Sequence, residues 1–273
     1  MNGPNTGGGR QPAPPAESMR DVLITPRIIA VDLDGTILTR DKQVSARTLN
    51  ALKSCQRQGI LLAFVTGRAY ARAKRYMESI RPDAAVLSYG AHVMVGGETI
   101  YRRYISARVG NRILQEVKNA EYIRYQTENG EYFTDRKEEN TLALDRDAVI
   151  GQRLDHLCAW GIPAGQAVAI SKRVRCSLTQ LCGSDWCNFA AYGCSKERGF
   201  RRLMNHLGLP ERSGIGFGDE DCDIGFFRAC GTGVAMRNGD QATKKAADYV
   251  TESNEEDGVA LFLEKHILGQ HIF

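Results

Sequence analysis

Apolar residues along the chain fall into short continuous runs separated by helical patterns. The first runs are Arg27 to Leu33, Ile60 to Val65 and Ala84 to Leu87. Continuous aliphatic runs of this length are typical of strands buried on both faces of a parallel sheet. Helical patterns lie between them, from an N-cap at Ser45 to Gln58 and from Ala69 to Ile80. This alternation predicts an α/β fold with right-handed parallel crossovers.

The same alternation returns near the end of the chain. The predicted strands there are Ser213 to Phe217, Gly231 to Met236 and the short Tyr249-Val250. The predicted helices are Ser195 to Leu207, Asp221 to Ala229, Gln241 to Ala246 and Glu256 to Ile267. We therefore expect both ends of the chain to contribute strands to one sheet.

The middle of the chain has shorter, alternating segments. Gly96-Gly97 separates Ala91 to Val95 from Glu98 to Tyr101, which predicts a hairpin. The other predicted segments are helices at 108–119 and 145–159 and strands at 122–126, 131–134, 167–170 and 174–181. We interpret this stretch as an α+β module with an antiparallel sheet, inserted into the first domain. The expected division is a disordered tail at 1–20, a core at 21–89 and 189–273, and an inserted domain at 90–188.

Composition narrows the class of protein. Of 273 residues, 42% are hydrophobic and 25% charged, which excludes collagen, coiled coil and wholesale disorder. No apolar run approaches the length of a membrane helix, and the tail has no apolar signal region. The eight cysteines are expected to be reduced thiols in a cytoplasmic protein. The net charge of +4 is mild and scattered, so it indicates small anionic substrates rather than nucleic acid or membrane partners.

Two carboxylates follow the first predicted strand, in the segment Asp32-Leu-Asp-Gly-Thr36. Open α/β sheets bind ligands at the carboxyl ends of their strands, so Asp32 and Asp34 are expected at such an edge. The first can act as a nucleophile, and the second can transfer protons to and from oxygen. Gly35 permits a tight turn after the strand. The alternative interpretation is a polar turn without catalytic function.

Three further segments supply groups that bind phosphate or a metal. Thr66-Gly67-Arg68 ends the second strand and offers a hydroxyl and N–H groups to an anion. Lys196 opens a helix and by itself is uninformative. The segment Gly218 to Asp223 contains four carboxylates in five positions, an oxygen-rich set that suits Mg²⁺, although an acidic helix start is the alternative. Taken together, these groups predict phosphoryl transfer.

The order of these motifs resembles the haloacid dehalogenase superfamily, specifically its Cof-type (HAD-IIB) sugar-phosphate phosphatases. The matching segments are Asp32 to Thr36, Thr66 to Arg68, Ser195-Lys196, Gly218 to Asp223, Gly231 to Met236, Ala247 to Thr251 and Glu256 to Val259. The resemblance implies a Rossmann-like, doubly wound parallel-sheet core with an inserted α+β cap domain of the C2B type. It also implies an Mg²⁺-dependent phosphatase of small phosphorylated metabolites that works through an aspartyl-phosphate.

The resemblance also assigns roles to residues. Asp32 is the implied nucleophile and Asp34 the implied general acid and base. The implied phosphate-binding residues are Leu33, Thr66, Gly67 and Lys196. The implied metal ligands are Asp32, Asp34 through its backbone carbonyl, and Asp219, with Asp223 and Cys222 around them. The alternatives are a phosphomutase, or a non-catalytic or weakly active regulatory protein that binds a phosphorylated ligand.

The chain departs from the family pattern at three positions. Cys222 and Tyr89 each replace an Asn, and Arg237 replaces a Gly. These replacements suggest an altered substrate pocket, because the four main chemical positions remain. Leaving-group recognition is expected within 90–188, but the residues there are assigned no role. The residues considered are His92, Arg102, Arg103, Tyr125, Lys172, Arg173 and Trp186. Both a monomer and a homodimer are compatible with the sequence.

Overall fold

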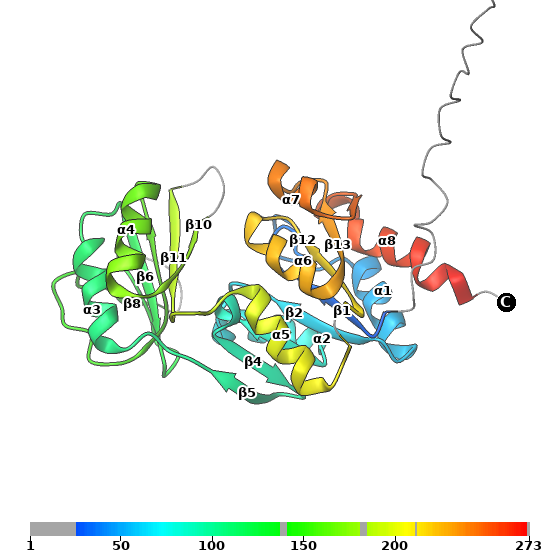
Figure 1. The fold of residues 1–273 in the computed structure, drawn as a ribbon, viewed down its shortest axis with the longest axis horizontal. Helices are drawn as coiled ribbons and strands as arrows, with labels where there is room; N and C mark the ends of the chain where they lie inside the picture. The colour runs from blue at the N-terminus through cyan, green and yellow to red at the C-terminus, as the bar shows by residue number, and fades with distance from the viewer. Residues whose placement is uncertain (1–25, 137–140, 181–184, 211, 272–273) are drawn as a thin grey trace, which may run out of the picture.

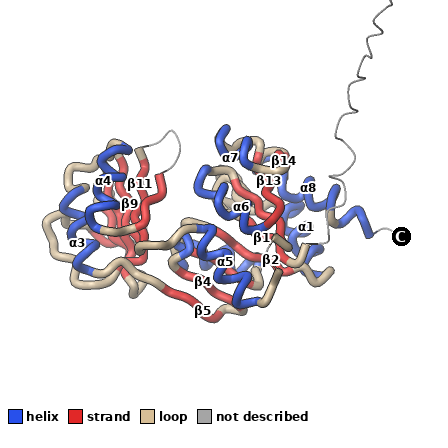
Figure 2. Tube along the Cα trace, in the orientation of Figure 1, coloured by secondary structure: helices blue, strands red, loops and turns tan. Residues whose placement is uncertain are grey.

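The computed structural model describes residues 26–136, 141–180, 185–210 and 212–271, so the expected tail at 1–20 lies outside the described residues. The chain forms two lobes, each built on its own sheet (Figure 1). Strands and helices alternate along the larger lobe, which contains both the first and the last described elements (Figure 2). The first and the last described strands therefore belong to one sheet.

The larger sheet has eight strands in the order β14-β13-β12-β1-β2-β3-β4-β5. Its strands are β1 (Ile28–Val31), β2 (Leu61–Val65), β3 (Ala84–Leu87), β4 (His92–Val95), β5 (Glu98–Arg102), β12 (Gly214–Gly218), β13 (Gly231–Met236) and β14 (Tyr249–Thr251). Neighbours from β14 through β3 pair in parallel, whereas β4 and β5 pair antiparallel. The central position of β1 places its carboxyl end in the middle of the ligand-binding edge.

Helices cover both faces of this sheet. They are α1 (Ala46–Arg57), α2 (Tyr70–Ile80), α5 (Lys196–Leu207), α6 (Ile224–Cys230), α7 (Gln241–Ala246) and α8 (Gly258–His266). Ile29 of β1 packs in the core formed with α1, α2 and α8, and its neighbour Ile28 packs in the core formed with α5 and α6. Because successive side chains of a strand point to opposite faces, the aliphatic runs fill both cores. This arrangement confirms the predicted doubly wound sheet.

The smaller sheet has six strands in the order β10-β11-β9-β6-β7-β8, antiparallel except for the β7–β8 pair. Its strands are β6 (Tyr122–Thr127), β7 (Tyr132–Thr134), β8 (Leu142–Ala143), β9 (Leu154–Trp160), β10 (Ser177–Gln180) and β11 (Trp186–Ala190). The helices α3 (Ala107–Glu116) and α4 (Ala164–Val174) pack on its outer face, away from the larger lobe (Figure 1). The inner face is thus left for polar side chains.

Three predictions for the middle of the chain are wrong. The hairpin of β4 and β5 extends the larger sheet by pairing with β3, so it is not part of the inserted sheet. Residues 154–160 form β9 rather than a helix, because the strand lies between β6 and β11 and both neighbours hydrogen-bond to it. Residues 167–170 lie within α4, since a short apolar run does not distinguish a strand from a buried helix. The strand β11 was not predicted.

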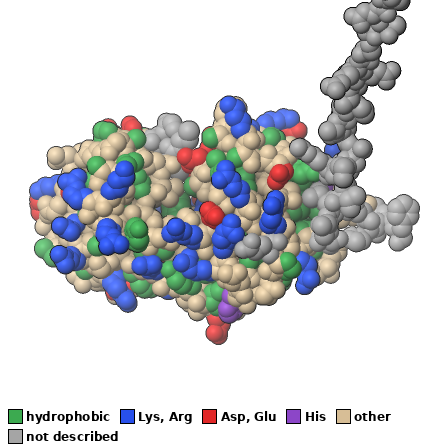
Figure 3. All heavy atoms as spheres, in the orientation of Figure 1, with side chains coloured by type: hydrophobic (Ala, Val, Ile, Leu, Met, Phe, Trp, Pro, Cys, Tyr) green, Lys and Arg blue, Asp and Glu red, His purple; other side chains and the backbone are tan. Residues whose placement is uncertain are grey.

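The described helices include none that is long and apolar enough to cross a membrane. Lys and Arg side chains are spread over both lobes on the face shown in Figure 3, rather than gathered in one patch.

Candidate active site

Asp32 lies directly after β1, at the centre of the ligand-binding edge. Its backbone N–H donates to the carbonyl of Phe217 at 3.0 Å, which extends the pairing of β1 with β12 by one residue. The side chain is 4% exposed, and its Oδ2 lies 3.2 Å from Nζ of Lys196. Its Oδ1 is buried and has no hydrogen-bond partner among the residues that the structure describes. One carboxylate oxygen is therefore left for an outside group.

Lys196 reaches this point from the first turn of α5, whose N-cap is Ser195. Its Nζ also lies 2.7 Å from Oδ1 of Asp223, and both side chains are almost completely buried. The other oxygen of Asp223 accepts the backbone N–H groups of Asp219 and Glu220 at 3.2 and 3.1 Å. Both oxygens of Asp223 are thus already engaged, and this residue shapes the loop after β12.

Asp32, Asp219 and Asp223 present carboxylate oxygens that all lie within 4.8 Å of one another. Burial raises the pKa of Asp32 and of Asp219, and repulsion from neighbouring carboxylates raises both further. A bound divalent cation would offset this cost, because it favours the ionised carboxylates. The donors are all oxygen and one buried oxygen is unpartnered, so these residues fit Mg²⁺.

Gly35 makes the close approach of Asp219 possible. Its φ is +72°, and a Cβ built on it would lie 2.7 Å from Cγ of Asp219. Thr36, the next residue, donates its hydroxyl to Oδ1 of Asp219 at 2.9 Å. The Asp-Gly-Thr segment thus positions a carboxylate that lies 183 residues away in the chain.

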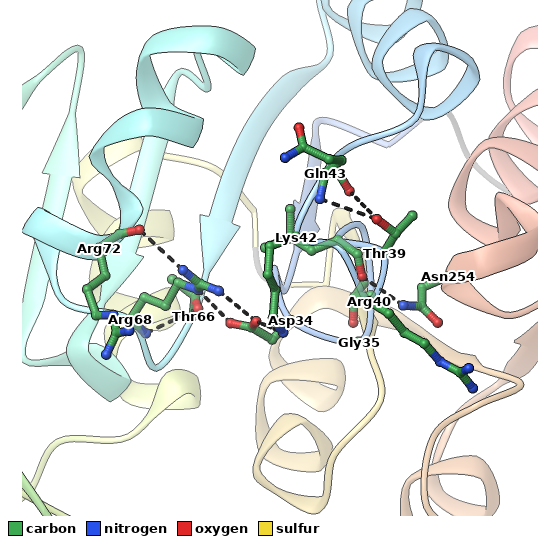
Figure 4. A network of polar contacts seen from close by, with 12 residues as sticks. Asp34, Gly35, Thr39, Arg40, Lys42, Gln43, Thr66, Arg68, Arg72 and Asn254 are labelled. Atoms are coloured by element: carbon green, nitrogen blue, oxygen red, sulfur yellow. Dashed lines mark hydrogen bonds and ion pairs between the residues drawn. The ribbon is translucent and has the colours of Figure 1, made fainter. Parts of the chain in front are cut away.

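Asp34 is held between two basic side chains (Figure 4). Arg68 donates from Nε and Nη2 at 2.6 and 2.7 Å, and Lys42 donates from Nζ at 2.7 Å. Burial by itself would raise the pKa of Asp34, but the hydrogen bonds and charges of Arg68 and Lys42 outweigh it and lower that pKa below its ordinary value. In this arrangement Asp34 is ionised at neutral pH, as a proton acceptor must be.

The turn after β2 brings Thr66 and Gly67 to the same edge. Thr66 is 1% exposed, and its Oγ1 accepts the backbone N–H of Arg68 at 3.2 Å. A Cβ on Gly67 would lie 2.6 Å from the hydroxyl oxygen of Tyr89. Gly67 therefore allows the Tyr89 ring, which stands where the related pattern has Asn, to lie against the turn.

A cavity of about 330 Å³ joins these groups to the smaller lobe. The residues singled out in the sequence that line this cavity are Asp32, Asp34, Thr66, Gly67, Arg68, Tyr89, Trp186 and Lys196. The Leu33 side chain instead lies in the hydrophobic core. Cys222 lines a separate, smaller cavity, with its Sγ 3.8 Å from Oε2 of Glu220. Asp219 and Asp223 are not among the lining residues of the main cavity.

The sequence interpretation missed three lining residues of the smaller lobe. Arg124, His156 and Asn188 come from β6, β9 and β11 and line the main cavity. The polar–apolar alternation of Tyr122 to Thr127 is the signal that could have placed Arg124 on the face away from the core. His156 and Asn188 lie on strands that were not predicted, so no such signal was available for them. His92 and Arg102, which the sequence had singled out, line a different cavity.

The sequence pattern of the haloacid dehalogenase-like hydrolases matches residues 29–153 and 180–263, which include Asp32, Asp34, Thr66, Lys196 and Asp219 but not His156. The chain belongs to this family. The fold agrees, since the HAD subclass IIB sugar phosphatase BT4131 superimposes with a TM-score of 0.77 at 20% identity, over 88% of this chain and 98% of that one. The expectation of a Cof-type phosphatase with a Rossmann-like core and a cap is confirmed.

Several curated relatives of this haloacid dehalogenase hydrolase are phosphatases. A 5-amino-6-(5-phospho-D-ribitylamino)uracil phosphatase, YitU of Bacillus subtilis, is 28% identical over 88% of this chain and 97% of its own length. The pyridoxal phosphate phosphatase YbhA of Escherichia coli is 25% identical over 90% of this chain and 100% of its own. A phosphoglycolate phosphatase of Methanosarcina acetivorans is 26% identical over 87% and 95%, respectively. These matches support a phosphoric monoester hydrolase, as expected from the sequence.

Proposed function

We propose that this protein is an Mg²⁺-dependent phosphatase of small phosphorylated metabolites that works through an aspartyl-phosphate on Asp32. The observation that carries the proposal is the state of the Asp32 carboxylate. It is buried, one oxygen is held by Lys196, and the other has no partner in the described part of the chain. A preorganised carboxylate at a strand end, beside cations and hydroxyls, suits attack on phosphorus.

In the proposed reaction Asp32 forms a bond to phosphorus, and the bond from phosphorus to the ester oxygen breaks. Thr66 and Lys196 hold the phosphoryl oxygens, and Asp34 gives its proton to the leaving oxygen. Asp34 then removes a proton from water, which attacks the aspartyl-phosphate and releases phosphate and free Asp32. When bound at Asp32, Asp219 and the carbonyl of Asp34, Mg²⁺ would neutralise charge on the phosphoryl group.

Asp34 must carry a proton for the first of these steps. Arg68 and Lys42 favour its ionised form as long as both contact it. Both cations line the cavity, where an incoming phosphate dianion competes for the same donors. We therefore propose that substrate binding weakens the contacts of Asp34 with Arg68 and Lys42 and raises its proton affinity when the acid is needed.

The test is hydrolysis of para-nitrophenyl phosphate with Mg²⁺, with EDTA, and by the Asp32→Asn variant. We expect turnover with Mg²⁺ alone and none by Asp32→Asn, since an amide is nearly isosteric but not nucleophilic. Asp41→Asn removes an exposed carboxylate of the same loop and is expected to retain activity. Substantial hydrolysis by folded Asp32→Asn, or full activity in thorough chelation, would contradict the proposal.

A further inference from the structure

The smaller sheet presents a polar face to the active-site cavity. In the strand register Cys158 of β9 is opposite both Arg124 of β6 and Asn188 of β11. Residues in register point to the same side of a sheet, so these three side chains form one row. Their chain neighbours Leu157 and Phe189 point to the other side, into the core under α3 and α4. The row therefore faces away from the helices, and Arg124 and Asn188 line the cavity.

This row holds buried hydrogen-bond donors without acceptors. Asn188 is 3% exposed, and its Oδ1 accepts the thiol of Cys158. That bond orients the amide so that Nδ2 is its free end, and Nδ2 is buried with no partner among the described residues. Nε of Arg124 is in the same state. Nδ1 of His156, which lies two residues before Cys158 in β9 and is 4% exposed, also has no partner among the described residues. Buried donors are normally satisfied, so an acceptor is missing from this part of the cavity.

The missing acceptor should be negatively charged. No Asp or Glu among the described residues lies within ion-pair distance of Arg124, whose guanidinium lies over the Trp186 ring, 4.5 Å from its centroid. A half-buried cation without a counterion is costly. Burial lowers the pKa of the neighbouring His156 to about 3, and the positive charges of Arg124, Arg72 and Arg102 contribute. His156 is thus neutral at neutral pH, in surroundings that favour an anion.

We propose that the substrate carries a carboxylate on its leaving group, and that Arg124 and Asn188 bind this carboxylate. One guanidinium matches a single negative charge, and the N–H groups of Arg124 and Asn188 match two carboxylate oxygens. Trp186 forms an apolar wall beside them. The inference deepens the proposed phosphatase function and rests on it for the other end of the substrate, where Asp32 meets the phosphoryl group.

The test compares two aryl phosphates of equal shape, 4-carboxyphenyl phosphate and 4-carbamoylphenyl phosphate. They differ in the charge of the group that would reach Arg124. We expect the wild type to favour the carboxylate in kcat/KM by about tenfold or more, as for one charge-assisted contact. Arg124→Met should bring the two values to within about twofold, chiefly by lowering the value for the carboxylate ester. Arg112→Met, an exposed cation on the far side of the same lobe, should keep the preference.

A binding measurement separates this inference from the proposed function. Calorimetric titration of the Asp32→Asn protein with each ester does not depend on turnover, and tighter binding of the carboxylate ester is expected. Asn188→Asp places an anion in the row and should reverse the preference, which provides a second variant if Arg124→Met does not fold. Equal binding of both esters by Asp32→Asn overturns the inference and leaves the phosphatase proposal standing. A retained binding preference without any hydrolysis by the wild type overturns only the phosphatase proposal.

Discussion

Replacing Gly35 by Ala should weaken the metal site without substituting any proposed ligand. The added Cβ would lie 2.7 Å from Cγ of Asp219, so this carboxylate must move. Displacing the support of a metal ligand typically lowers affinity by about 10- to 100-fold. Gly59→Ala is the matched control, because Gly59 also has a positive φ, +81°, but nothing lies within 4 Å of its added Cβ. Both variants share a backbone cost of roughly 1–2 kcal/mol.

The difference between the two variants can be followed by thermal unfolding with and without Mg²⁺. At 100 times the dissociation constant, a ligand stabilises the folded state by about 2.7 kcal/mol. For a chain of this size that corresponds to a rise in Tm of roughly 5–10 °C. If the site of Gly35→Ala binds Mg²⁺ 10- to 100-fold more weakly, the same Mg²⁺ concentration stabilises the folded state by only about 0.4–1.4 kcal/mol. The corresponding rise in Tm is roughly 1–6 °C. Gly59→Ala should show the full rise.

The assay measures Tm in EDTA and at one fixed Mg²⁺ concentration for all three proteins. In EDTA both variants should unfold at lowered temperatures, and the rise in Tm on adding Mg²⁺ is compared for each protein. The reasoning is refuted if Gly35→Ala gains as much from Mg²⁺ as Gly59→Ala does, since the overlap with Asp219 would then have no effect on the metal. A parallel titration of para-nitrophenyl phosphate hydrolysis should give a higher half-saturating Mg²⁺ concentration for Gly35→Ala only.

Three other variants test single contacts of the site. Lys196→Met should lower the free energy of unfolding by about 3–5 kcal/mol, because the carboxylates of Asp32 and Asp223 stay buried without a cation. A urea titration that shows a loss of less than about 1 kcal/mol would contradict this. Lys42→Met should cost at most about 1 kcal/mol, since Lys42 and Asp34 are 49% and 40% exposed. The folded-state pKa of Asp34 is lowered well below its ordinary value, so this contribution is fully present above about pH 4 and is lost only as the pH falls through that lowered pKa; a difference in urea midpoint between the two proteins that already disappears between pH 7 and pH 4 would argue against it. Cys222→Asn should change kcat/KM by less than about threefold, because the thiol lines the separate smaller cavity. A tenfold gain would show that an amide at this position reaches the phosphoryl group.

The larger lobe and the core of the site could be predicted from the sequence. The strands β1, β2 and β3 are buried on both faces, so each appears as a continuous apolar run such as Ile60 to Val65. In a parallel sheet the residues that follow such runs meet at one edge. Asp32, Thr66 and the acidic segment after Phe217 could therefore be expected together before any contact was known, and all three lie at that edge.

The smaller lobe could not be predicted in the same way. Leu154 to Trp160 has no strong local preference, and it becomes a strand because β6 and β11 pair with it on both sides. That pairing also places Arg124 and Asn188 on either side of Cys158 on one face, although 64 positions separate them in the chain.

The state of the site residues likewise depends on distant contacts. Asp34 is ionised because Arg68, which lies 34 residues away in the chain, reaches its carboxylate. The sequence by itself determined which chemical groups stand at the ends of the buried strands, because burial imposes a local pattern. Only the tertiary structure decided which charges face one another and which donors lack an acceptor, because cross-strand register and side-chain contacts between distant segments leave no periodic trace in the sequence.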